Sequence, residues 1–171
     1  TRILAARDVA SPRLDRKLPV IVKLAPDVAV DDLPEIVSCI LTCGADGICV
    51  SNTTLTRPNV DGQPNADEAG GLSGAPLFDL STSMLARVYH LTQGAVPLIG
   101  VGGVHSGATA VAKMEAGASL IQLYTGMIYG GPGLITEMKT ALAAAARDAQ
   151  ATHISELVGV RADEWAAKLD Y

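Results

Sequence analysis

Two short stretches in the second half of the chain have the residue types that bind a phosphate. In GVGGVHSG, Gly102 and Gly103 end an apolar run and leave the main chain bare, and in QLYTG, Tyr124 and Thr125 follow another apolar run. Glycines let anionic oxygens reach main-chain N–H groups, and a threonine hydroxyl adds a donor. We predict that both stretches bind a ligand phosphate; a tight turn without a ligand is the alternative for the glycine pair.

Lys23 is a charged residue inside the apolar segment PVIVKL. Burying an ammonium group is costly unless an acceptor or an anion lies opposite it. We therefore expect Lys23 to face a ligand, for example a cofactor ring or a reduced species that carries negative charge. The alternative is a pairing with a carboxylate in the core.

Three polar residues follow one another in VSNTT, namely Ser51, Asn52 and Thr53. An asparagine side chain donates and accepts hydrogen bonds at once, so it suits a planar ring with carbonyl and N–H edges. Strand alternation predicts that Ser51 and Thr53 point to one side and Asn52 to the other. A strand that simply ends in a turn is the alternative.

A long polar loop follows and ends in AGGLSGAPL, which contains Ser73 and Gly74. Loops longer than about 12 to 15 residues without regular structure tend to be functional. We predict that Ser73 and Gly74 approach a ligand; a flexible hinge is the alternative.

Strands and helices alternate along the chain in a way that brings these residues together. Short, apolar, β-branched runs predict buried strands, and apolar residues at helical spacing predict the helices between them. The predicted strands are 19–24, 45–52, 96–102 and 119–124, and the predicted helices are 31–42, 77–92, 107–116 and 134–149. Uniformly apolar strands joined by helices indicate a parallel sheet in an α/β protein.

Two α/β architectures fit four such units, a small doubly wound sheet and half of a (β/α)₈ barrel. In this sequence each predicted strand ends in polar residues or glycines at its carboxyl end, as the ring of active-site loops on a barrel requires. We therefore favour four parallel βα units forming half of a TIM barrel.

Composition excludes several classes of protein. The chain has 171 residues with 49% hydrophobic content and a formal net charge of −5, without the basic clusters that nucleic acid would require. No apolar run is long enough for a membrane helix, and no signal peptide is visible, so the chain reads as soluble. We interpret Cys39, Cys43 and Cys49 as buried thiols, and neither they nor the three histidines form a metal pattern, so no metal site is predicted.

Five motifs in this order resemble the C-terminal half of dihydroorotate dehydrogenase, a flavin enzyme built on a (β/α)₈ barrel. They are VIVKLAPD, VSNTT, GGLSGAPL, IGVGGVHSG and GASLIQLYTG. The ending LYTG is similar to the quinone-dependent class 2 enzymes. The resemblance implies that residues 1–171 are the second half of one FMN-binding barrel domain, and that the first half precedes Thr1.

The resemblance also implies roles for individual residues. The FMN-binding residues would be Lys23, Ser51, Ser73, Gly74, Gly102, Gly103, Tyr124 and Thr125. Lys23 would lie at the flavin ring, and Gly102, Gly103, Tyr124 and Thr125 would cradle the phosphate. Asn52 and Thr53 would hold the pyrimidine ring of the substrate.

The implied reaction is the oxidation of dihydroorotate to orotate in pyrimidine biosynthesis, with electrons passed to a quinone. The family's catalytic base would lie upstream of Thr1, so we expect this chain to be inactive alone. The longer protein would be associated with a membrane, either mitochondrial or bacterial. Two alternatives remain: a class 1 relative that uses fumarate or NAD, and a non-catalytic phosphate-binding half barrel. Half a barrel leaves two sheet edges open, through which the chain could self-associate.

Overall fold

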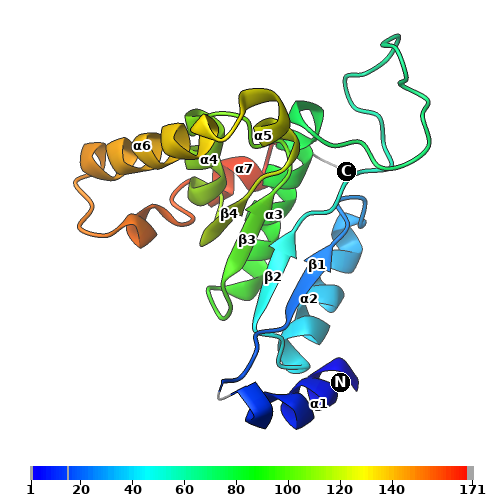
Figure 1. Cartoon of the computed structure of the whole chain (residues 1–171), viewed down its shortest axis with the longest axis vertical. Coiled ribbons are helices and arrows are strands. Elements are labelled where there is room, and N and C mark those ends of the chain that lie inside the picture. The colour runs from blue at the N-terminus through cyan, green and yellow to red at the C-terminus, as the bar shows by residue number, and fades with distance from the viewer. Residues whose placement is uncertain (1, 15, 169–171) are drawn as a thin grey trace.

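The structure is a computed structural model that describes residues 2–14 and 16–168, and its centre is a parallel sheet (Figure 1). The four strands are hydrogen-bonded in the order β1-β2-β3-β4. Their bounds are β1 Ile21–Leu24, β2 Gly47–Val50, β3 Leu98–Val101 and β4 Leu120–Gln122. All four predicted strands are confirmed, each shortened by two to four residues.

One predicted helix follows each strand along the chain. Their bounds are α2 Leu33–Thr42, α3 Phe78–Thr92, α4 Gly107–Glu115 and α6 Gly133–Asp148. Short 3₁₀ turns at Val30–Asp32 and Ala75–Leu77 lead into α2 and α3. In Figure 1 the loop between β2 and α3 projects beyond the carboxyl ends of the strands.

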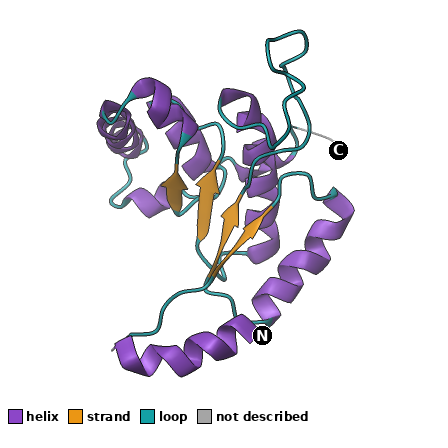
Figure 2. Ribbon diagram, turned by 45° about the vertical axis from the view of Figure 1, so that its right-hand side comes forward, coloured by secondary structure: helices purple, strands orange, loops and turns teal. Residues whose placement is uncertain are grey.

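The two faces of the sheet have different environments. Leu24, Ile48, Val50 and Leu98 are buried in the main core, where they pack with residues of α2 and α3. α3 contacts β2 and β3, whereas α4 contacts β3 and β4, so the helices cover this face (Figure 2). At alternate positions of the two edge strands, Ile21, Lys23, Leu120 and Gln122 point the other way and are exposed, whereas Cys49 on the same face of β2 is buried.

This arrangement decides between the two predicted architectures. A doubly wound sheet reverses its strand order at a switch point and carries helices on both faces. Here the order follows the sequence without reversal, and the core helices lie on one face. The fold is therefore four parallel βα units of a partial (β/α)₈ barrel, as predicted.

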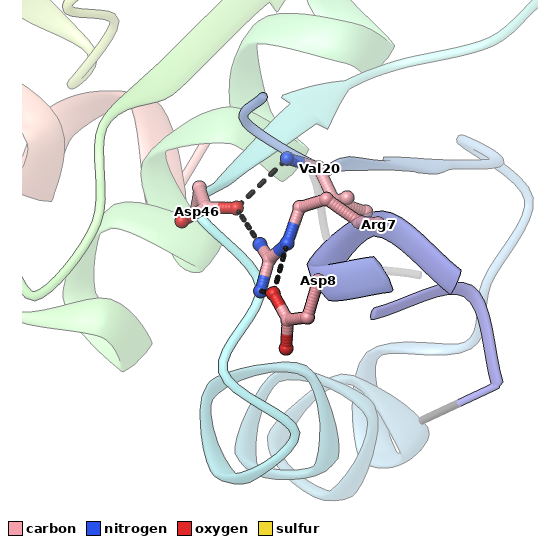
Figure 3. Close-up of polar contacts among 4 residues, drawn as sticks. All are labelled: Arg7, Asp8, Val20 and Asp46. Atoms are coloured by element: carbon pink, nitrogen blue, oxygen red, sulfur yellow. Dashed lines mark hydrogen bonds and ion pairs between the residues drawn. The ribbon is translucent and has the colours of Figure 1, made fainter. Parts of the chain in front are cut away.

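The N-terminal helix α1, Arg2–Ala10, lies beyond the amino ends of the strands and is fastened there by one ionic cluster (Figure 3). Arg7 Nη1 donates to Asp46 Oδ2 at 2.7 Å, and the Val20 N–H donates to the same oxygen at 2.8 Å. The Val20 N–H and the Arg7 guanidinium hold the pKa of Asp46 below its ordinary value. Arg7 also contacts Asp8 at 2.9 Å.

Several features differ from the sequence-based prediction. Two short helices, α5 Thr125–Gly130 and α7 Ala162–Ala166, and a 3₁₀ turn at Ile154–Leu157 were not predicted. The prediction of three buried thiols is wrong for Cys39 on α2 and for Cys43 at its C-cap, which are both exposed, and right for Cys49. No helix in the described part of the chain is long and apolar enough to cross a membrane.

Candidate functional site

One pocket lies at the carboxyl ends of the four strands, with a volume of about 390 Å³. All ten residues that the sequence singled out line it, together with Leu77, Val101, Val104, Gln122, Leu123 and Gly126. The lining comes from four strand ends and from the segment before α3, which are far apart in the sequence. Its volume is in the range of small-molecule sites.

Lys23 provides the positive charge on the β1 side of this pocket. Its backbone is in register with Cys49 of β2, and its side chain is exposed on the face that the core helices do not cover. Burial raises the pKa of the Cys49 thiol, and the nearby Lys23 ammonium opposes this rise. No carboxylate among the described residues is paired with Lys23, which leaves its ammonium available to an anionic or electron-rich ligand.

The segment after β2 brings three consecutive polar residues to the pocket. Ser51 is buried and its Oγ donates to the Asn52 carbonyl at 3.0 Å, whereas Asn52 and Thr53 are exposed. The peptide between Val50 and Ser51 is cis. Because β2 ends at Val50, strand alternation no longer applies, and all three residues line the same pocket rather than opposite sides.

Asp27 supports this segment and was missed by the sequence analysis. Its carboxylate accepts hydrogen bonds from the Thr54 hydroxyl and from the Leu55 N–H, the latter at 3.0 Å. Thr54 also pairs with Leu72 through two main-chain hydrogen bonds of 3.1 and 2.8 Å. The two ends of the long loop are thereby held together beside the pocket.

The long loop also contacts the start of α5. The hydroxyls of Ser73 and Thr125 lie 2.9 Å apart, and a Cβ on Gly74 would be 3.2 Å from Thr125 Cγ2. At the start of α5 the Met127 N–H already donates to the Tyr124 carbonyl at 3.0 Å, so only the N–H groups of Thr125 and Gly126 are without a main-chain acceptor among the described residues. Hydroxyls and N–H groups together form a donor-rich end of the pocket.

Gly102 and Gly103 form the other wall of this donor-rich end. The structure gives a different reason from the predicted one for the absence of side chains at these two positions. Both have positive φ angles, 109° and 71°. A Cβ on Gly102 would lie 2.8 Å from Ser81 Oγ, and one on Gly103 would lie 2.4 Å from Phe78 Cα. The first turns of α3 therefore exclude a side chain here, and the approach of a ligand is not needed to explain the glycines.

Gln122 is a further pocket residue that the sequence analysis did not select. Its Oε1 lies 3.8 Å from Cys49 Sγ, on the same face of the sheet as Lys23. The sequence signal that could have identified Gln122 is its position as a polar residue within the apolar strand SLIQLY. Within the described ranges, no group of three or more His, Cys, Asp or Glu is placed to hold a metal ion.

Comparison with known proteins gives concordant results. The family described as Dihydroorotate dehydrogenase matches residues 2–145. A protein of Chelativorans sp. (strain BNC1) named dihydroorotate dehydrogenase (quinone) is 46% identical over 165 residues, which is 96% of this chain and 45% of the relative. A mitochondrial dihydroorotate dehydrogenase (quinone) of Oryza sativa subsp. japonica is 50% identical over 143 residues, 83% of this chain and 30% of the relative.

Solved structures agree with these sequence matches. The crystal structure of DHODH from Eimeria tenella in complex with ferulenol superposes with a TM-score of 0.80 at 34% identity. The match covers 85% of this chain and 39% of that one. The chain thus spans less than half the length of these relatives.

Proposed function

This chain belongs to the dihydroorotate dehydrogenase family, and from that premise we propose that it forms the cofactor- and substrate-binding half of a quinone-dependent dihydroorotate dehydrogenase. The reaction is the oxidation of dihydroorotate to orotate in pyrimidine biosynthesis, with FMN as cofactor and a quinone as the final acceptor. The names of the relatives support the quinone over fumarate or NAD.

The observation that carries the proposal is the convergence of the selected residues on one pocket. Ten residues selected for their chemistry, from segments spread over a hundred positions of sequence, line one cavity at the carboxyl ends of parallel strands. In (β/α)₈ enzymes the active site lies at this end of the barrel. A random set of surface residues has no reason to converge in this way.

The residues present fit FMN at both of its ends. The donor-rich end, with the hydroxyls of Ser73 and Thr125, suits the phosphate, and Gly74, Gly102, Gly103 and Tyr124 line the pocket beside it. At the other end Lys23 and Ser51 would lie at the flavin ring. When bound, FMN accepts the hydride that the substrate loses.

The other residues act on the substrate and on charge. Asn52 and Thr53 are exposed in the pocket, where their side chains would hydrogen-bond the carbonyl and N–H edges of the pyrimidine ring. The Lys23 ammonium would stabilise negative charge that develops near it during the reaction. The base that removes the C5 proton of dihydroorotate would come from the part of the longer relatives that this chain does not match, and membrane association would belong to that longer protein.

Flavin binding tests the proposal directly. The purified chain is titrated with FMN while flavin fluorescence is followed, and we expect saturable quenching. We then expect dihydroorotate to leave the flavin absorbance of the chain alone unchanged, and to bleach it once a preparation containing the remaining part of a relative is added. Absence of FMN binding would contradict the proposed site. Bleaching by the chain alone at an enzymatic rate would contradict the assignment of the base elsewhere.

A further inference from the structure

The side-chain amino group of Lys113, on α4, is fully buried behind the pocket wall. Its side chain is 0% exposed, and its one hydrogen-bond partner among the described residues is Ser81 Oγ, 2.7 Å from Nζ. Nζ also lies 5.3 Å from the centroid of the Phe78 ring. Burial lowers the pKa of Lys113 well below its ordinary value, and Asp79 only partly opposes this.

No described carboxylate forms an ion pair with Lys113. Asp79, the nearest acidic influence on it, is engaged instead by Lys168, whose Nζ lies 2.8 Å from Asp79 Oδ1. A buried charge without a counterion is costly, and proteins seldom retain one without a use. The position of Lys113 therefore needs an explanation outside the packing of α3 against α4.

Ser81 links Lys113 to the glycine turn of the pocket. Because Lys113 Nζ donates to Ser81 Oγ, the hydroxyl proton of Ser81 is free to point to a carbonyl. The Gly102 carbonyl oxygen lies 3.0 Å from Oγ, and the Phe78 carbonyl oxygen lies 3.2 Å away. Lys113, Ser81 and Gly102 thus form a continuous chain of contacts from the buried ammonium to the pocket wall.

Fixing the Gly102 carbonyl also fixes the next N–H group. In a trans peptide the C=O of one residue and the N–H of the next point in opposite directions. The Gly102 carbonyl points to Ser81 in α3, so the Gly103 N–H points away from α3. Gly103 O lies 2.7 Å from His105 Nδ1, which must donate because a carbonyl oxygen only accepts, so the Val104 N–H points away from the His105 ring. Gly103 and Val104 both line the pocket.

We propose that Lys113 is a positioning residue for the phosphate end of the flavin nucleotide: through Ser81 it holds the Gly102–Gly103 turn with its N–H groups toward the phosphate, and the phosphate supplies the negative charge that Lys113 lacks. This inference rests on the proposed FMN site and adds to it a residue that does not touch the cofactor. It predicts that Lys113 matters for the phosphate and not for the flavin ring.

The comparison of FMN with riboflavin isolates this effect, because riboflavin has the same ring without the phosphate. Dissociation constants of both ligands are measured for the unchanged chain, for Lys113→Met, which has a similar volume and no charge, and for Ser81→Ala, which breaks the link. Lys139→Met is the matched control, since Lys139 is exposed on α6. Thermal unfolding is recorded for each variant.

We expect the unchanged chain and Lys139→Met to bind FMN more tightly than riboflavin. In Lys113→Met and Ser81→Ala, FMN affinity falls by about tenfold, within the usual range of coupling between two sites, and riboflavin affinity stays the same. The Tm of Lys113→Met is unchanged or higher, because a buried ammonium has been removed. A purely structural lysine would instead lower the Tm and the affinity for both ligands together.

The outcomes separate this inference from the proposed function. Equal affinity of the unchanged chain for FMN and riboflavin would contradict the phosphate site itself, and with it the role of Lys113. A preference for FMN that survives in both Lys113→Met and Ser81→Ala would leave the site intact and overturn the positioning role. Parallel loss of Tm and of riboflavin affinity in Lys113→Met would also overturn it.

Discussion

Replacing Gly103 with alanine tests why the chain has a glycine at this turn. Gly103 has a φ of 71°, and an added Cβ would lie 2.4 Å from Phe78 Cα and 2.5 Å from the Phe78 nitrogen. Those atoms are main chain at the start of α3, so they cannot move aside as the end of a flexible side chain can. Alanine therefore introduces backbone strain and a steric overlap at the same time.

Gly44 offers a control in which only the strain is present. It follows the C-cap residue of α2 and has a φ of 77°, and nothing lies within 4 Å of a Cβ built on it. Left-handed backbone costs a non-glycine residue roughly 1–2 kcal/mol, which is the expected loss for Gly44→Ala. Overpacking costs typically a further 1–3 kcal/mol, so Gly103→Ala should lose about 2–5 kcal/mol.

Urea unfolding of both variants, followed by circular dichroism, measures the two losses. Their difference estimates the steric term and should be about 1–3 kcal/mol. If Gly103→Ala costs no more than Gly44→Ala, then α3 is not what excludes a side chain at Gly103. The approach of a ligand would then again be the better explanation of the glycine pair.

Three further predictions concern charge and thiols. Lys23→Met should weaken FMN binding while changing the free energy of unfolding by less than about 0.5 kcal/mol, because the Lys23 side chain is exposed. The control Lys17→Met, at another exposed lysine, should change neither quantity. Equal FMN affinity of the unchanged chain and both variants would remove Lys23 from the site. Hydrogen bonds and positive charge hold the pKa of Asp46 below its ordinary value, so its contribution to stability is present at neutral pH and is lost as the pH falls below about 4. In urea unfolding, Asp46→Asn should be less stable than the unchanged chain at pH 7 and should lose less stability on acidification. An unchanged dependence of stability on pH would contradict this. A thiol reagent should modify Cys39 and Cys43 in the folded chain and Cys49 only after unfolding. Cys39 should react more slowly than a free cysteine, because Cys43 raises its pKa. Equal reaction rates of the three thiols in the folded chain would show that Cys49 is not buried.

The sequence was sufficient for the main elements of the fold because their signals are local. Apolar β-branched runs such as PVIVKL and helical spacing such as that of 77–92 gave all four βα units to within a few residues. The polar residues at the strand ends were enough to choose a barrel over a doubly wound sheet, and that choice is confirmed. The residues of the pocket could be predicted for the same reason, since parallel strands bring their carboxyl ends to one edge.

Features that depend on distant contacts could not be predicted in this way. TGMIYG contains two glycines within six residues and resembles a loop, although it forms α5 against α6. Lys113 lies in AVAKMEA, where a lysine is normally solvent-exposed, and its burial arises from α3, more than twenty positions away. The exposure of Cys39 and Cys43 depends on which face of α2 the core covers, and a helix as apolar as this one leaves that face poorly defined.

The central claim is that strand ends from the whole chain converge on one binding site for a flavin nucleotide. Backbone amide chemical shifts measured by NMR during an FMN titration test it most directly. The largest shifts are expected together at Asn52, Gly103, Thr125 and Gly126. Shifts that are absent, or that cluster at the amino ends of the strands around Arg7 and Asp46, would contradict it.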